Sequence, residues 1–320
     1  MRRLTLLLLA VGAAFLVWML HQVGWGVLAE HLLRVGWAWW PLILIPYGLV
    51  NWLEAVSWRY LLLDPRTRPS LTRLFWLRLA GEALNQLTPT ASLGGEAFKA
   101  ARLTQAGVSF PDATASVVIH KGILVLSLVL YIVMGLAMAP WLLPEAASHL
   151  GLLTLGAGAL GAAGIAFLII QVRNPCGVSM RLLDKLGVCP AALKAREGSL
   201  NGLDARLATF YREHPGRCVL AFTLFFLSWV LHGVEVYVMF QALGHPISWP
   251  LALCLDALAM LFTALGFFIP AAVGVQEGGN ILLAMGFRLG AALGAAFSVL
   301  RRLREAFWLS LGLMVVAREK

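Results

Sequence analysis

Residues 85–103 read NQLTPTASLGGEAFKAARL, a polar stretch inside a chain of which 60% is hydrophobic. The stretch contains Pro89, the pair Gly94–Gly95 and the charged residues Glu96 and Lys99, and it stands close to long apolar runs on both sides. Two structures suit such a stretch. It is either a water-exposed loop or a broken helix that carries polar groups into a membrane, and the surrounding sequence decides between them.

The composition indicates an integral membrane protein. The mean hydropathy is +0.81 and only 13% of the residues are charged, which leaves too little polar surface to cover a soluble globule. Apolar runs close to the roughly 20 residues of a membrane-spanning helix occupy 4–23, 40–63, 114–140, 149–172, 216–241 and 295–317. Two further apolar regions, 75–103 and 250–293, are interrupted by proline and glycine. No polar block is long enough for a separate soluble domain, so residues 1–320 are predicted to form a single transmembrane domain.

The first apolar run has features of a signal peptide, because Arg2 and Arg3 precede it. However, the run is close to the length of a full span, and no clear cleavage site of small residues follows it. An uncleaved first span is therefore the favoured interpretation.

The net charge of +9 is distributed unevenly along the chain. Segment 173–217 holds eight Lys or Arg and four acidic residues, and segment 64–78 holds four Arg. The segments 141–148 and 242–249 contain no Lys or Arg. Basic loops remain in the cytoplasm, which places both termini, 64–78 and the basic loop 173–214 there. This pattern is typical of a multi-pass membrane protein, and nucleic acid is not expected as a partner.

Counting the crossings gives an all-α polytopic membrane protein with about six full spans. Every basic loop then lies inside, provided that 75–103 and 250–293 each enter and leave on the same side as re-entrant broken-helix hairpins. Each half of the chain, 1–140 and 149–320, then reads span, span, hairpin, span. In the alternative arrangement one or both hairpins cross fully, which would displace charged loops or the C-terminus.

The two halves also share rare polar residues at a constant spacing. Glu96 lies seven residues after Pro89, Glu277 lies seven residues after Pro270, and Glu277 follows Glu96 by 181 residues. The same shift aligns Glu54 with Glu235, Asn51 with His232, Lys121 with Arg302, and His120 with Arg301. An odd number of spans in each half turns the second half over, so these matches predict an inverted repeat, an architecture common among transporters.

Charged residues inside the membrane are candidates for function, because each costs about 3 kcal/mol to insert unless it meets a partner or water. The candidates in or beside apolar segments are Glu54, Glu82, Glu96, Lys121, Glu235, Asp256, Glu277, Arg301, Arg302, Arg304 and Glu305. Carboxylates and bases are present in similar numbers, so the alternative is a set of structural ion pairs that hold the helices together.

The two interrupted hairpins are the strongest candidates for a binding site. LTPTASLGGEAF (87–98) and FIPAAVGVQEGGN (268–280) both free backbone N–H and C=O groups that lipid cannot satisfy. A helix that begins near Gly94–Gly95 would direct its positive end at a phosphate or carboxylate, and Lys99 would add charge. The alternative is a plain helical hairpin at the membrane interface.

VLRRLREAFW (299–308) opens the last span. Its helical spacing places Arg301, Arg304 and Glu305 on one face and directs Arg302 elsewhere. This face is either a phosphate-binding surface paired to Glu277 or Glu235, or a cluster that snorkels to the membrane interface.

These residues together resemble one family. Pro89, Gly94–Gly95–Glu96 with Lys99, then Pro270, Gly274–Val275 and Glu277, and a basic residue opening the last span, are similar to the lysylphosphatidylglycerol synthase/flippase transmembrane family. The resemblance covers nearly the whole chain and implies lipid translocation or lipid handling in the bacterial inner membrane. It marks Glu96, Lys99, Glu277 and Arg302 as motif residues, with Lys121 as the repeat partner of Arg302. The hopanoid-associated HpnL branch fits the length of the chain.

The sequence departs from the family pattern in two places. Lys99 and Lys121 stand where Arg is expected, which weakens bidentate phosphate binding. PAAVGVQE (270–277) has alanines where the family often has glycine, so the second hairpin is expected to be less open. The aminoacyl-transferring soluble domain of the full-length synthases is absent from these 320 residues, so synthase activity is not expected.

We therefore expect a non-enzymatic lipid flippase or transporter for a polar or anionic phospholipid or hopanoid, without metal or cofactor. The predicted substrate-binding residues are Pro89, Gly94, Gly95, Glu96, Lys99, Lys121, Pro270, Gly274, Glu277, Arg301 and Arg302. The predicted coupling or pairing residues are Glu54, Glu235, Arg304 and Glu305. The alternatives are a membrane-embedded lipid-modifying enzyme and an accessory scaffold of a lipid-biosynthesis complex. Besides lipid, a second copy of the chain or a lipid-biosynthesis protein is the expected kind of partner.

Overall fold

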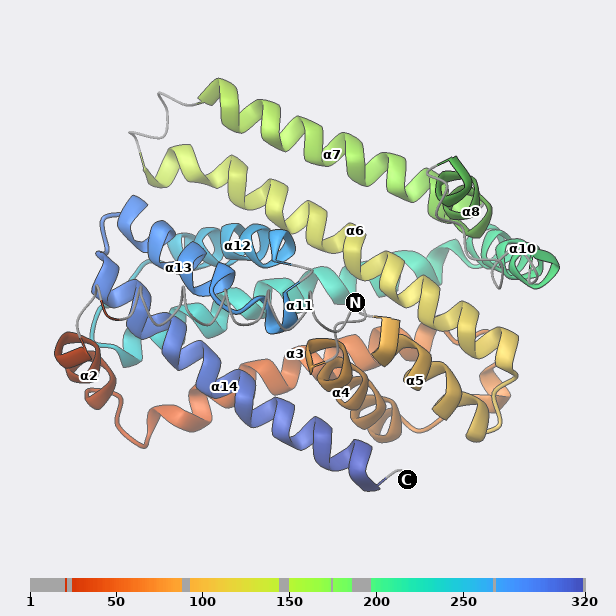
Figure 1. Cartoon of the computed structure of the whole chain (residues 1–320), viewed down its shortest axis with the longest axis horizontal. Coiled ribbons are helices and arrows are strands. Elements are labelled where there is room, and N and C mark those ends of the chain that lie inside the picture. The colour runs from red at the N-terminus through yellow and green to blue at the C-terminus, as the bar shows by residue number, and fades with distance from the viewer. Residues whose placement is uncertain are drawn as a thin grey trace.

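A computed structural model of the chain describes residues 21, 25–87, 93–143, 150–173, 175–185, 197–266 and 269–318 (Figure 1). Within these ranges all regular secondary structure is helical, which confirms the predicted all-α polytopic fold. Nearly all of the predicted first span 4–23, and Pro89 in the first hairpin, lie outside the described residues.

The helices follow one another in three groups. The first group is α2 (Trp25–Leu33), α3 (Trp39–Leu61), α4 (Leu71–Leu87), α5 (Leu93–Gln105) and α6 (Phe110–Leu142). The middle group is α7 (Leu150–Arg173), α8 (Pro175–Lys185) and α10 (Glu197–Glu213). The last group is α11 (Pro215–Ala242), α12 (Trp249–Leu265), α13 (Val275–Gly286) and α14 (Ala291–Arg318). Short 3₁₀ turns, Pro65–Thr67 and Pro270–Ala272, precede α4 and α13.

Local sequence fixes several helix starts. The side chain of Ser109 accepts a hydrogen bond from the backbone N–H of Asp112 at the start of α6. Ser248 does the same for Leu251 at the start of α12. Both helices have a proline in the first turn, where its missing N–H removes no helical hydrogen bond. These caps satisfy backbone donors that would otherwise be costly inside a membrane.

The apolar runs located the long helices well, but they do not fix the number of spans. Three described helices are long and apolar enough to cross a membrane by length and composition: α6, residues 154–173 of α7, and α11. The predicted spans in α3 and α14 fall outside this set; α14 carries the charged residues of segment 301–305 in its middle. Six full spans and re-entrant hairpins thus remain a prediction.

The helix order repeats, as the helix bounds show. α6 begins at 110 and α14 at 291, α5 ends at 105 and α13 at 286, and α3 ends at 61 and α11 at 242, so each pair is 181 residues apart. Both interrupted regions are helical hairpins, α4 with α5 and α12 with α13. The repeat predicted from polar residues therefore has a counterpart in the helix bounds, while the division into halves and their inverted orientation stay predictions.

Helices of the first group pack against helices of the last group. α3 packs along α11, α4 packs against α14, and α12 packs against α6. Each set nevertheless has its own apolar core: one cluster is built from α3, α4, α5 and α6 around Trp58 and Leu74, and another mainly from α11 to α14 around Phe240 and Phe297. Each hairpin therefore packs against the last long helix of the other group, α4 against α14 and α12 against α6.

The middle group lies at the edge of the molecule. α7 packs beside α6 in Figure 1, and most of its apolar window is exposed, including Leu155 and Ile165. Such a face suits contact with lipid chains. α8 and α10 contact each other, and α10 packs through Leu207 and Phe210 onto α6 and α11.

Candidate functional site

The first hairpin brings α4 and α5 into close contact at a glycine. A Cβ on Gly95 would collide with the carbonyl oxygen of Gly81, so only glycine permits this approach. The backbone N–H of Gly95 donates to Oδ1 of Asn85 at 2.8 Å, and Nδ2 of Asn85 donates to Oε1 of Glu96 at 3.2 Å. Asn85 therefore ties the first turn of α5 to α4 and orients the Glu96 carboxylate.

Glu96 is shared between two lysines. Nζ of Lys99 lies 2.6 Å from Oε2 of Glu96, one turn along α5. Nζ of Lys121, from α6, lies 3.8 Å from Oε1 of the same carboxylate. The Lys99 side chain is 4% exposed and the Lys121 side chain 36% exposed, so Lys121 is the accessible member of the group.

The second hairpin holds Glu277 more tightly. Gly274 has a φ of 84°, a left-handed conformation that favours glycine, and its backbone N–H donates to Oε2 of Glu277 at 2.7 Å. The other oxygen, Oε1, accepts a hydrogen bond from Nε of Arg302 on α14. Arg302 also donates to Glu305 at 2.8 Å, and Glu305 accepts from Gln276 at 3.0 Å. The Glu277 side chain is only 2% exposed.

The loop before α13 contains an unusual backbone. Ala271 and Ala272 have φ values of 52° and 48°, in the left-handed region that costs a non-glycine residue roughly 1–2 kcal/mol. These are the two alanines of PAAVGVQE (270–277) at which the sequence suggested a departure from glycine. The sequence predicted a less open second hairpin here, and this stays a prediction.

The two hairpins therefore present a matched pair of charges. We call Glu96 with Lys121 the first pair and Glu277 with Arg302 the second pair. Each pair joins the first turn of a hairpin helix to the following long helix. Glu277 follows Glu96, and Arg302 follows Lys121, by the same 181 residues. In each half, the glutamate and the base that the sequence shift matches to the other half lie in contact with each other.

A buried polar network connects α3 and α4 to α11 and α14. Glu54 pairs with Arg78, and Arg78 donates to Asn51. Asn51 in turn donates to the carbonyl oxygen of Tyr47 at 2.8 Å.

The network continues on the other side of Tyr47. The guanidinium carbon of Arg304 lies 4.0 Å from the centre of the Tyr47 ring, and Nε of Arg304 donates to Glu235 at 2.5 Å. Nδ1 of His232 lies 3.6 Å from the other oxygen of Glu235. Glu54 and Glu235, matched by the 181-residue shift, are thus both paired with arginine and joined through Tyr47.

A third set of charges lies between α6, α12 and α14. Nη1 of Arg301 lies 3.1 Å from Oδ1 of Asp256, and the hydroxyl of Tyr131 donates to Oδ2 of Asp256 at 3.1 Å. His120, which the shift aligns with Arg301, makes no such pair. It is buried between Trp58 and Phe225, and neither ring nitrogen has a partner among the described residues. The repeat is therefore broken at this position.

Three details differ from the sequence-based expectations. Arg78 does not belong to a cytoplasmic loop: α4 begins at Leu71, so Arg78 lies inside the helix and is 8% exposed. Arg302 does not point away from its neighbours, because at three residues' spacing it reaches Glu305. Arg301 and Arg304 are 3% and 2% exposed and paired, which excludes a snorkelling cluster.

Sequence reasoning also missed several partners. Arg78, Tyr131, Asn85 and Tyr47 were not singled out, although each contacts a charged group of the networks. One signal was available for Arg78, which stands four residues before Glu82 within an apolar helical segment. The others depend on which helices pack together.

Comparison with known proteins identifies the family. A family described as the lysylphosphatidylglycerol synthase TM region matches residues 5–312 of the 320. The chain belongs to this family. It is accordingly a membrane protein of a lipid-related family, and the suspected resemblance is confirmed. Comparisons with curated proteins and with solved structures returned no match.

Within this chain of the lysylphosphatidylglycerol synthase TM region family, the geometry permits one clear kind of chemistry. The first pair joins a carboxylate to a lysine that is held at 3.8 Å and is partly exposed. Such a lysine can leave its carboxylate and bind another anion, because the separation is at the limit of an ion pair. Substrate binding by the hairpin residues is a prediction.

Proposed function

We propose that this protein moves a polar or anionic membrane lipid between the leaflets of the bacterial inner membrane without catalysing its chemical conversion. Family membership supports a lipid-related role. The single observation that carries the proposal is the contact of the matched charge pairs, Glu96 with Lys121 and Glu277 with Arg302, at the two broken hairpins.

The first pair is the proposed headgroup site. A lipid phosphate or carboxylate would replace Glu96 as the partner of Lys121. Lys99, held at 2.6 Å from Glu96, would keep the carboxylate neutralised while Lys121 is engaged. The lipid chains would remain in the bilayer beside the hairpin.

The second pair and the buried polar network that contains Glu54 and Glu235 have a different proposed role. Glu277, Glu235 and Glu54 are each paired with an arginine and almost fully buried. Breaking such pairs is costly, so they are proposed to fix the helices around which the first hairpin moves. The described residues present no nucleotide-binding sequence, so movement would be downhill or coupled to an ion.

Reconstitution tests the proposal directly. The full chain is incorporated into vesicles that carry a fluorescent phospholipid, and translocation is followed by dithionite quenching of the outer leaflet. We expect equilibration at least about tenfold faster than in protein-free vesicles. The Glu30→Gln variant is the control, because Glu30 forms an exposed pair with Arg34 outside the hairpins. Equal rates with and without protein would contradict a transport function.

A lipid-modifying enzyme is the competing candidate. Lipid analysis of cells that lack the gene separates the two functions. An unchanged set of lipids with an altered distribution between leaflets supports transport, whereas the loss of one lipid species supports the enzyme.

A further inference from the structure

Two histidines from distant parts of the chain lie together at the edge of the molecule. The ring centres of His31, on α2, and His245, just after α11, are 5.5 Å apart, and the ring planes meet at 57°. Figure 1 shows α2 beside the end of α11. Neither histidine belongs to the predicted site, and the pair arises only because helices of the first and last groups pack together.

The residues next to each histidine fix its position. Leu32 follows His31 and packs against the apolar cluster that contains Phe240. Ile247, two residues after His245, is a buried member of the same cluster. The backbone N–H of His245 also donates to the carbonyl oxygen of Phe240 at 3.1 Å. Both imidazoles are thus carried by segments anchored on one core, so little further ordering is needed before they share a ligand.

The separation of the two rings fits a single bridging metal ion. Zinc binds an imidazole nitrogen at about 2.0–2.1 Å, and the nitrogen lies about 1.15 Å from its ring centre, so the ion lies roughly 3.2 Å from each centre. A near-tetrahedral angle at the metal, about 109–120°, then separates the ring centres by about 5.2–5.5 Å. The observed separation of 5.5 Å agrees with this geometry.

One of the imidazole nitrogens lacks a partner. Nδ1 of His31 is buried and has no hydrogen-bond partner among the described residues. A buried polar atom without a partner is unfavourable, and coordination of a metal would satisfy it. Glu30 and Arg34 lie near His31 on α2 and pair with each other at 2.7 Å, so their opposite charges largely cancel for an approaching cation.

We propose that His31 and His245 bind one zinc ion, with water in the remaining coordination positions. Imidazole is among the ligands that zinc prefers. No group of three or more His, Cys, Asp or Glu side chains suits a metal in the part of the chain that the structure describes, so two protein ligands hold the ion. Structural zinc sites have four protein ligands, and this site is therefore exchangeable. The proposal departs from the sequence-based expectation of a chain without a metal.

A metal at this position would fasten two parts of the fold together. α2 packs against α14, and His245 lies in the segment 243–248 that joins α11 to α12, the first helix of the second hairpin. Coordination would link the start of that hairpin to α2 and, through α2, to α14. Because only the folded chain brings the two imidazoles together, zinc is expected to stabilise the folded state.

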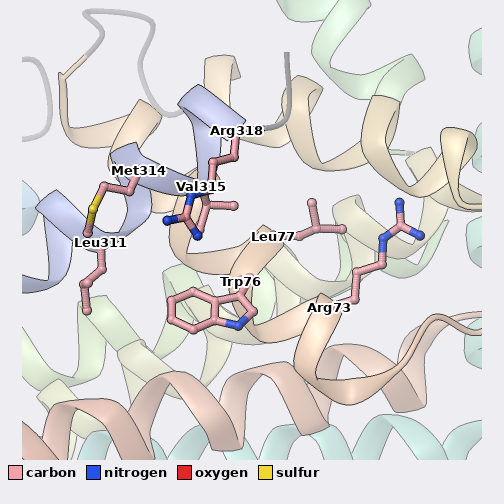
Figure 2. Close-up of a pocket in the computed structure, with 7 residues that line it drawn as sticks. All are labelled: Arg73, Trp76, Leu77, Leu311, Met314, Val315 and Arg318. Carbon is pink, nitrogen blue, oxygen red and sulfur yellow. The ribbon is translucent and has the colours of Figure 1, made fainter.

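The groove between the start of α4 and the end of α14 offers no comparable site. Its volume is about 500 Å³, and Figure 2 shows Arg73 and Arg318 on opposite sides of Leu77. The seven lining residues drawn in Figure 2 include no His, Cys, Asp or Glu. A zinc ion therefore finds no side-chain ligand among them.

Zinc binding is measured by isothermal titration calorimetry on the full chain in detergent, after removal of any polyhistidine tag. We expect one saturable zinc site per chain, and binding at least about tenfold weaker in His31→Gln and in His245→Gln. The matched control is His214→Gln, which removes an imidazole at the start of α11 and is expected to bind zinc as the wild type does. Unchanged binding in His245→Gln, equal loss in the control, or no saturable binding by the wild type up to about 1 mM zinc overturns the proposal.

A conservative replacement separates coordination from a structural role. His245→Cys keeps a zinc ligand at an exposed position, so it is expected to retain the binding that His245→Gln loses. Zinc is likewise expected to raise the unfolding temperature of the wild type and of His245→Cys, but not that of His245→Gln. Equal loss of binding in both variants, or an equal rise in unfolding temperature in all three proteins, overturns the proposal. Neither measurement involves lipid movement, so a failed transport assay leaves the result unaffected.

Discussion

The two hairpins contain the same carboxylate–base pair but hold it in different ways. In the second pair, Glu277 is bound at both oxygens, by the backbone of Gly274 and by Arg302. In the first pair, Glu96 contacts Lys121 only at 3.8 Å, and its side chain is 14% exposed against 2% for Glu277. The same repeated pair is thus held tightly at one hairpin and loosely at the other, and we propose that the loosely held contact is exchangeable.

The largest expected effect comes from breaking the second pair, Glu277 with Arg302. Glu277→Gln removes the partner of Arg302 and weakens the cap of α13, so we expect a loss of about 3 kcal/mol in the free energy of unfolding. Thermal unfolding in detergent measures it. Glu96→Gln serves as the matched variant at the first pair, with an expected loss of about 1 kcal/mol, because the Glu96 side chain is 14% exposed against 2% for Glu277. Equal losses would show that the two pairs are held alike.

A smaller effect follows from making the first pair resemble the second. Lys121→Arg supplies a planar guanidinium that can bind the Glu96 carboxylate through two hydrogen bonds. We expect a gain of about 1 kcal/mol in stability together with slower lipid translocation. The reverse change, Arg302→Lys, is the control and is expected to lower stability. A variant at position 121 that is more stable and equally fast would contradict an exchangeable first pair.

The smallest effect concerns the strained turn of the second hairpin. Ala271→Gly relieves the left-handed φ of 52°, and after the greater flexibility of glycine is subtracted we expect a gain of about 0.5–1 kcal/mol. Ala284→Gly, in the regular part of α13, is the control and is expected to lose about 1 kcal/mol. Destabilisation by both changes would show that Ala271 is not strained.

The sequence predicted the elements of the fold better than their contacts. Apolar runs placed the long helices within a few residues, as for 114–140 against Phe110–Leu142 in α6. The short helix α2 escaped notice because nine residues provide too little periodicity. Proline, glycine and charge spacing located both hairpins, because the cost of open backbone and of buried charge is a local property of the sequence.

Partner choice could not be predicted in the same way. Asp256 with Arg301 and Glu54 with Arg78 are neighbours only because α12 packs near α14 and α3 near α4. Charge counting also assigned Arg78 to a loop, because a count of basic residues does not separate a buried helical arginine from an exposed one. The repeat shift aligned Glu96 with Glu277 and Lys121 with Arg302, and in each half the aligned carboxylate lies beside the aligned base.

The most direct test of the exchangeable first pair is the translocation rate of the Glu96→Gln variant in proteoliposomes, normalised to folded protein. The account predicts a rate at least about tenfold below that of the wild type, equivalent to about 1.4 kcal/mol, although the variant unfolds only slightly earlier. A wild-type rate in this variant would contradict the claim that the first hairpin is where the lipid headgroup binds.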